Sequence, residues 1–278
     1  MSEADTRARL QAFREQGDAA SLLEAALIVA GAGREDFDGA AVEVELERIA
    51  AGAMAAVPAF GPLRSRLEGL CGYLRDGCGF AGDAARYHEA DNSLLDRVLE
   101  TRRGIPVTLA VIYVEVAGRI GLDCAGVNFP GHFLVRADAG DASLLVDPFA
   151  GAVLDREACL ALLRSTQGPE AELRTGHLAP ATPVVVLVRM LNNLKQLAVA
   201  GERWYEALRW SELILLAEPG LVLEHGERAA LFERTGQLDL ALAELQLLDA
   251  AVADEELKAR IAREMERIAG RGGGRTVH

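Results

Sequence analysis

Apolar residues recur at helical spacing through the first quarter of the chain. Four leucines repeat at intervals of 4, 3 and 4, which places them on one face of a helix: Leu63, Leu67, Leu70 and Leu74. A second apolar stripe follows a polar start at Ser21 and comprises Leu22, Leu23, Ala26 and Leu27. A Gly77-Cys78-Gly79 run then interrupts the pattern, as glycine permits. We therefore expect an N-terminal helical segment over residues 1–76.

The next apolar pattern predicts a short helix and then a buried one. Residues 91–101 carry an apolar inner face, with Asn92 or Ser93 as the N-cap. Pro106 suits the first turn of a helix, because its missing N–H costs nothing there. From Pro106 to Arg119 the chain is apolar nearly all round, which indicates a buried helix. Its β-branched residues would also allow a strand, but its length favours a helix that ends at Gly121.

Short strand-like runs follow the buried helix. They occupy residues 124–129, 132–137 and 143–146, and Gly140-Asp141 supplies a turn between the last two. A helix followed by hairpin-linked strands is typical of an α+β core. The predicted fold is therefore α+β and predominantly helical, with a small antiparallel sheet.

An internal repeat marks the C-terminal part of the chain. The pair Ala207-Leu208 recurs as Ala241-Leu242, and a glycine precedes each pair. This offset matches the period of about 34 residues, with small residues at helix crossings, that is typical of tetratricopeptide repeats, although an unrelated helical bundle is the alternative. We expect tetratricopeptide-like helices over 183–269, with the last helix as a cap. The Gly- and Arg-rich residues 270–278 are expected to be a disordered tail.

Charge and cysteine content narrow the class of protein. The 278 residues include 29 Lys and Arg against 42 Asp and Glu, a net charge of −13. Such a surface repels phosphate backbones and anionic lipid, so nucleic-acid and membrane partners are disfavoured. No run of about 20 apolar residues and no secretory signal is evident, so we expect a cytoplasmic protein. The four cysteines form no C-x-x-C pair, so we expect no metal site and no cofactor.

Two long motifs carry a family resemblance. They are N-S-x-L-x-x-V-L-E-x-R-R-G-I-P, which begins at Asn92, and N-F-P-G-H-F-L-V-R, which begins at Asn128; LLVDPF follows them. These residues resemble the SirB regulator family of transglutaminase-like proteins with C-terminal tetratricopeptide repeats, over roughly residues 40–250. The resemblance implies a papain-like, transglutaminase-like core, which we expect at 77–180.

In that superfamily a cysteine begins a buried helix, a histidine lies on the following strand and an aspartate on the next. The resemblance implies that His132 is the histidine and Asp147 the aspartate of a paired imidazole and carboxylate. Alone, His132 would be read as a satisfied core histidine. The nucleophile does not fit, because Gly104-Ile105-Pro106 stands at the helix start and Pro106 occupies the cysteine position. The Thr108 hydroxyl points about 200° away around the helix and does not replace it.

Three interpretations of the core follow. In the first, His132 and Asp147 are a remnant dyad of a non-catalytic protein, which the resemblance favours because Gly-Ile-Pro belongs to the pattern of this branch. In the second, a recruited thiol acts as the nucleophile, with Cys78 first and Cys124 next. In the third, the cleft performs another reaction, such as hydrolysis, with His132 as the base. We therefore lean towards a protein that is not an enzyme.

Further residues are candidates for the cleft. Asn92 and Ser93 are helix caps or, by the family motif, line the cleft. Arg102 and Arg103 either bind an anion above the helix start or belong to a solvated loop with ion pairs to Glu100 and Asp147. Thr108 and Asn128 complete the set, and Asn128 and Gly131 are expected to shape the turn before His132.

These observations predict a regulatory or adaptor protein. Tetratricopeptide helices present a concave surface that binds peptide segments or helices, so we expect a protein partner there. The family resemblance implies a link to gene regulation, which the net charge of −13 would place in protein contacts rather than in direct contacts with DNA. The alternative is a cysteine-protease-like or other hydrolase that uses a recruited thiol with His132 and Asp147.

Overall fold

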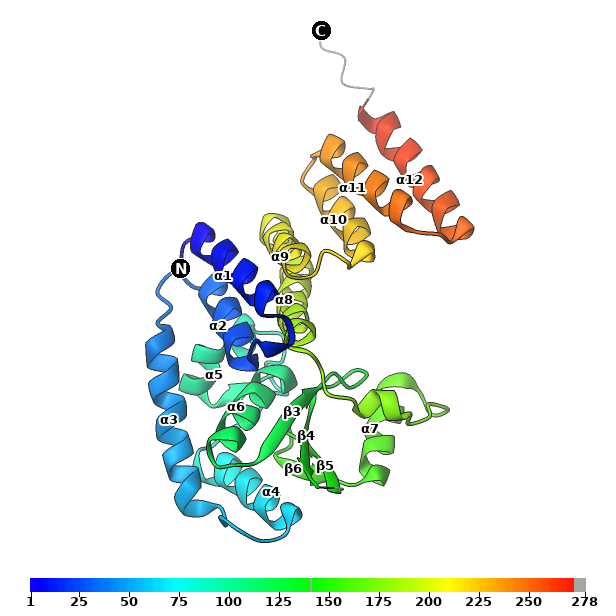
Figure 1. Cartoon of the computed structure of the whole chain (residues 1–278). Helices are drawn as coiled ribbons and strands as arrows, with labels where there is room; N and C mark the ends of the chain where they lie inside the picture. The colour runs from blue at the N-terminus through cyan, green and yellow to red at the C-terminus, as the bar shows by residue number, and fades with distance from the viewer. Residues whose placement is uncertain (141, 273–278) are drawn as a thin grey trace. The chain divides into compact units, whose positions relative to one another are not determined.

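The chain folds as two compact units, one spanning Met1–Met190 and one that begins at Leu191. The structure, a computed structural model, describes residues 1–140 and 142–272 (Figure 1). The division falls within helix α8, Pro183–Ala200. The boundaries expected from the sequence at residues 76, 180 and 183 stay predictions.

Helices α1 to α4 form the N-terminal part of the first unit, and η2, Tyr73–Gly77, continues α4. They are α1 Glu3–Gln16, α2 Leu22–Gly33, α3 Gly39–Ala56 and α4 Leu63–Gly72. Three of them begin at a side chain that accepts backbone N–H bonds: Ser2 before α1, Ser21 before α2 and Asp38 before α3. Helices α2 and α3 both pack against α6. The helical pattern read in residues 1–76 is therefore present.

Helix α6, Pro106–Arg119, is the central element of the first unit. Pro106 is its first residue, as predicted, and every residue from Pro106 to Tyr113 is buried. The helix packs against α3 on one side and against strands β3 and β4 on another (Figure 1). Gly121 follows the helix at φ 72°, a left-handed conformation that glycine adopts without strain.

A four-stranded antiparallel sheet packs against α6 in the order β3-β4-β5-β6. The strands are β3 Asp123–Val127, β4 Leu134–Ala139, β5 Ala142–Asp147 and β6 Ala152–Leu154. The α+β, predominantly helical fold with a small antiparallel sheet is thus confirmed. Strand β6 and helix α7, Arg156–Gln167, were not predicted. His132 does not begin a strand as predicted, because the Pro130-Gly131 turn extends past it and β4 begins at Leu134.

The segment before α6 differs from the prediction at its helix start. Helix α5, Leu95–Thr101, follows the 3-10 turn η3, Ala90–Ser93, and its N-cap is Leu94 without a side-chain bond. Asn92 and Ser93 are therefore not N-caps of α5. Short parallel strands β1, Ala81–Gly82, and β2, Arg103–Gly104, pair with each other, and β2 lies between α5 and α6 in the chain. This pairing holds the residues that lead into α6.

Helices α8 to α12 form the C-terminal part of the described chain. After α8 come α9 Trp204–Ala217, α10 Val222–Arg234, α11 Leu238–Ala251 and α12 Glu255–Gly272. Helix α12 continues to Gly272, past the predicted end at 269, so residues 270–272 are helical and not a tail. The rest of the predicted disordered tail, residues 273–278, lies outside the described residues.

The repeat offset read in the sequence recurs in the geometry of these helices. Helix α11 starts and ends at the same offset from α9 as the second Ala-Leu pair has from the first. The ends of α8 and α10 are separated by that offset too. The turns match as well, because Glu202 has φ 55° and Gly236, at the equivalent position of the next repeat, has φ 77°. Ala207 and Ala241 are both fully buried. The spacing is that of tetratricopeptide helices, and the assignment to that class stays a prediction.

Candidate functional site

His132 and Asp147 lie side by side in the first unit. His132 Nε2 and Asp147 Oδ1 are 2.9 Å apart, and only 13% and 12% of the two side chains is exposed. His132 sits in the turn before β4, while Asp147 is the last residue of β5. The sheet therefore brings together two residues that are 15 positions apart in the chain.

The Asp147 carboxylate is held in place by the backbone. Its Oδ1 accepts the N–H of Phe149 at 2.9 Å and that of Ala150 at 3.3 Å, in addition to His132. A carboxylate fixed in this way orients the imidazole, because Nε2 carries the proton that points to Asp147. The remaining ring nitrogen, Nδ1, is then the one able to accept a proton in the neutral ring.

Phe149 covers one side of the imidazole. Its ring meets that of His132 edge to face, with centroids 6.2 Å apart. A Cβ placed on Gly82 would lie 2.3 Å from Phe149 Cδ2, so only glycine fits beneath this ring. Tyr87 lies beyond Phe149, with centroids 6.2 Å apart, and 40% of it is exposed.

Pro106 stands at the place where the resemblance puts the nucleophile. It is the first residue of α6 and is buried, and the preceding Ile105 makes no side-chain cap. A helix N-terminus stabilises a nearby negative charge, which is how a thiolate is favoured there. Proline offers no group to ionise, so this helix terminus serves no nucleophile of its own.

The native thiols are poor substitutes for that nucleophile. Burial raises the pKa of Cys71 and Cys124 to about 12 and that of Cys159 to about 11, so these thiols are protonated at neutral pH. Cys78 is half-buried in the turn after η2 and lies beside the Tyr73 hydroxyl. Within residues 1–140 and 142–272, no cysteine is hydrogen-bonded to His132.

The two arginines of the family motif point to different neighbours. Arg102 Nη2 donates to Glu45 Oε1, and its guanidinium lies 4.7 Å from the centroid of the Phe80 ring. Bonds from Arg48 and then Arg102 lower the pKa of Glu45 to about 2. Arg103 Nη1 instead donates to the carbonyl of Gly79 at 2.6 Å. The expected ion pairs to Glu100 and Asp147 are not made by these residues within the described chain.

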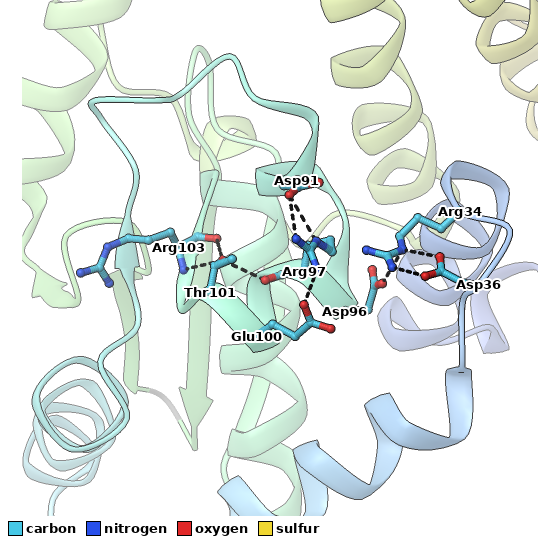
Figure 2. A network of polar contacts seen from close by, with 8 residues as sticks. All are labelled: Arg34, Asp36, Asp91, Asp96, Arg97, Glu100, Thr101 and Arg103. Atoms are coloured by element: carbon cyan, nitrogen blue, oxygen red, sulfur yellow. Dashed lines mark hydrogen bonds and ion pairs between the residues drawn. The ribbon is translucent and has the colours of Figure 1, made fainter.

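Glu100 pairs with a different arginine, as Figure 2 shows. Arg97 Nη1 donates to Glu100, and Arg97 Nε donates to Asp91 Oδ2 at 3.2 Å. On the other side of α5, Arg34 bridges Asp36 and Asp96 (Figure 2). These pairs connect α5 to the end of α2 and to the turn before α5. Their role is therefore structural.

Asn92 anchors the loop that carries Tyr87. Its Nδ2 donates to the carbonyl of Arg86 at 2.7 Å, and its own carbonyl accepts the N–H of Ile105 at 3.2 Å. Asn92 therefore connects the Tyr87 loop with the residue that precedes α6. Ser93 and Thr108, the other polar candidates here, are 1% and 0% exposed.

The buried Thr108 hydroxyl has no hydrogen-bond partner among the described residues. Replacing Thr108 with valine keeps the shape and removes this unpaired group, so we expect the free energy of unfolding to rise by about 1 kcal/mol. Chemical denaturation of the two proteins measures this difference. Thr101→Val is the matched control, since Thr101 Oγ1 donates to the carbonyl of Arg97 at 2.8 Å. An equal loss of stability in both variants would show that Thr108 has a partner.

Asn128 leads to a residue that was not predicted. Its Oδ1 accepts a bond from Arg189 Nη1 at 2.8 Å, and Arg189 Nη2 lies 3.4 Å from the His132 carbonyl oxygen. Arg189 belongs to α8 but to the first compact unit. The available signal was a lone charge in the otherwise apolar run from Val184 to Met190. Sequence reasoning missed the arginine because α8 was assigned to the C-terminal helices.

The described part of the chain holds no group of three His, Cys, Asp or Glu side chains placed to bind a metal ion. Within the same residues, no helix has the length and apolar character needed to cross a membrane.

The fold and the paired site define a class of protein that comparison with known proteins supports. A helix that begins at Pro106, packed on a sheet that carries a histidine–aspartate pair, is the arrangement expected of a transglutaminase-like core. Residues 40–192 match the family model described as the Transglutaminase-like superfamily.

Individual relatives narrow the family. A UPF0162 protein of Pseudomonas aeruginosa is 32% identical over 84% of this chain and 84% of its own length. Protein SirB1 of Salmonella typhimurium is 27% identical over 85% of this chain and 88% of its own. A UPF0162 protein of Xylella fastidiosa strain Temecula1 is 37% identical, but the chain spans only 63% of that protein's length. The chain spans 54% of the length of the UPF0162 protein from strain 9a5c. No solved structure matches the chain. The chain belongs to the transglutaminase-like superfamily and, within it, to the SirB family of UPF0162 proteins.

Proposed function

We propose that this chain is a non-catalytic transglutaminase-like protein that regulates by binding another protein through its C-terminal helices. The observation that carries the non-catalytic part is the buried proline at the first position of α6. Acyl transfer by this class needs an ionisable thiol at a helix N-terminus beside the histidine. Pro106 provides neither a thiol nor a proton, while His132 and Asp147 keep their bond.

The chemistry of the native cysteines supports the same proposal. Burial holds Cys71, Cys124 and Cys159 in the protonated form, and a thiol rather than a thiolate is a weak nucleophile. The intact His132–Asp147 pair favours the alternative of a hydrolase with a recruited thiol, for which partly exposed Cys78 is the candidate. The two functions differ in whether the reactivity of any cysteine thiol depends on His132.

The C-terminal helices supply the support for protein binding. Their repeat offset is that of tetratricopeptide arrays, which bind peptide segments and helices of other proteins. Large apolar side chains are exposed on these helices, with Tyr205 72% and Leu223 64% exposed. A net charge of −13 disfavours nucleic acid as the partner.

Thiol reactivity tests the proposal. The folded protein is treated with a limiting electrophile at neutral pH, and the labelled cysteine is mapped in the unmodified chain, in His132→Ala and in His88→Ala, a control on an exposed histidine. We expect slow labelling that neither substitution changes. One fast-reacting cysteine that slows in His132→Ala but not in His88→Ala would establish the hydrolase and identify its nucleophile.

A further inference from the structure

The Arg189 guanidinium is held by neutral oxygens alone. It donates to the Asn128 side-chain oxygen and to the His132 carbonyl, and within the described chain no carboxylate lies within 4.0 Å of it. The chain as a whole carries 42 acidic against 29 basic residues. By contrast, Arg86 pairs with Asp83 and Arg136 with Asp138. Arg189 therefore carries a positive charge that the described residues leave uncompensated.

Arg189 also has hydrogen-bond donors to spare. An arginine has five N–H donors in a planar fork, and the two bonds described above use only two of them. The Arg189 side chain as a whole is half-buried, so part of it remains open to a ligand. Partial burial lowers the pKa of Arg189 by removing water from the charged group, with the Tyr87 phenol acting in the opposite direction. A bound anion would stabilise the guanidinium charge in place of the missing water.

The surroundings of Arg189 restrict the kind of anion. Its Nη2 bonds to the backbone carbonyl of His132, and the ring of His132 begins an aromatic row in which His132, Phe149 and Tyr87 follow one another at 6.2 Å. Such a row suits an apolar or aromatic group. A single planar guanidinium matches a carboxylate by two parallel bonds, whereas a phosphate dianion is usually bound by several cations.

We propose that Arg189, with the aromatic row of His132, Phe149 and Tyr87, forms a binding site for a carboxylate carried on an apolar or aromatic group, such as the C-terminal end of a peptide. The site lies beside the His132–Asp147 pair, where the superfamily would process an acyl group. This assignment goes beyond the proposed function and does not depend on it, because either a binding protein or a hydrolase would use such a contact.

Titration with hippurate, a carboxylate joined to an aromatic ring, tests the site. Nitrogen–proton NMR spectra of the arginine Nε–H groups follow Arg189 directly. We expect a saturable shift of the Arg189 signal with a Kd of about 1 mM, the scale reached by a ligand of this size. Hippurate methyl ester, which lacks the charge, is expected to leave that signal unmoved. Arg189→Gln should weaken binding about tenfold or more, since a bond to a charged group is lost.

Arg64→Gln is the matched control, because Arg64 is a surface arginine paired with Glu68 and carries the same charge. Binding that is unchanged in Arg64→Gln and weakened in Arg189→Gln supports the site. If Arg189→Gln does not fold, the comparison of hippurate with its ester on the unmodified chain decides. The proposal would be overturned if the ester bound as tightly as hippurate, or if Arg189→Gln bound hippurate as tightly as the unmodified chain. Tighter binding of inorganic phosphate than of hippurate would also overturn it. None of these outcomes bears on thiol reactivity, so the proposed function stands or falls separately.

Discussion

Replacing Lys195 with methionine is expected to lower the free energy of unfolding of the C-terminal unit by about 3–5 kcal/mol. Lys195 is 1% exposed, and its Nζ lies 2.7 and 2.6 Å from the two carboxylate oxygens of Glu224 and 2.7 Å from Glu227. Glu224 is itself 8% exposed, and among the described residues its carboxylate has one other partner, the Ser211 hydroxyl at 2.6 Å. Removing the lysine leaves a buried carboxylate without a counter-charge.

The chain provides a reporter and a control for this experiment. Its only two tryptophans, Trp204 and Trp210, both lie on α9, so their fluorescence during urea unfolding follows this unit. Lys258, the only other lysine, is 38% exposed and 3.5 Å from Glu255. Lys258→Met is expected to change stability by less than about 0.5 kcal/mol. A similarly small effect of Lys195→Met would show that the buried ion pair is not formed.

Gly131→Ala is expected to lower the free energy of unfolding of the first unit by about 2–5 kcal/mol. Gly131 has φ 72°, which strains any residue with a Cβ, and a Cβ there would lie 2.6 Å from Thr166 Cβ. The substitution therefore combines backbone strain with a collision between the turn and α7. Because Gly131 precedes His132, the same change should loosen the bond to Asp147.

Gly121→Ala separates the two causes. Gly121 has the same φ of 72°, but nothing lies within 4 Å of the position of its Cβ. We expect it to cost about 1 kcal/mol, from backbone strain alone. Hydrogen exchange of the β4 amides measures both variants, since it reports opening of this sheet. Equal effects of the two substitutions would contradict the packing of Gly131 against Thr166.

Local patterns predicted the elements that local chemistry determines. Helix α6 was predictable because Pro106 starts it, its residues are apolar all round and Gly121 follows it. The start of α5 was not, because Asn92 turns away from the N-cap to bind the Arg86 carbonyl, a contact made through the tertiary fold. Strand β6 was missed because its three residues are too short to show a period.

The same division holds at the site. His132 and Asp147 were predicted as a pair from the family resemblance, and the sheet brings them within 2.9 Å. Their functional role stays a prediction. Arg189 reaches the site from a helix 57 residues beyond His132, a contact that no local pattern encodes. The different contacts of Arg102 and Arg103 likewise depend on partners distant in the sequence, Glu45 and Gly79.

The claim that Pro106 occupies a vacated nucleophile position is tested most directly by restoring the thiol. In Pro106→Cys, with Cys78→Ser to remove the candidate native thiol, the pKa of the introduced thiol is measured by the pH dependence of its alkylation rate. The N-terminus of α6 favours a thiolate, and the superfamily arrangement would pair that thiolate with His132, so we expect a pKa well below the ordinary value of about 8.5. Adding His132→Ala should raise that pKa. A value at or above about 8.5, unchanged by His132→Ala, would contradict the account.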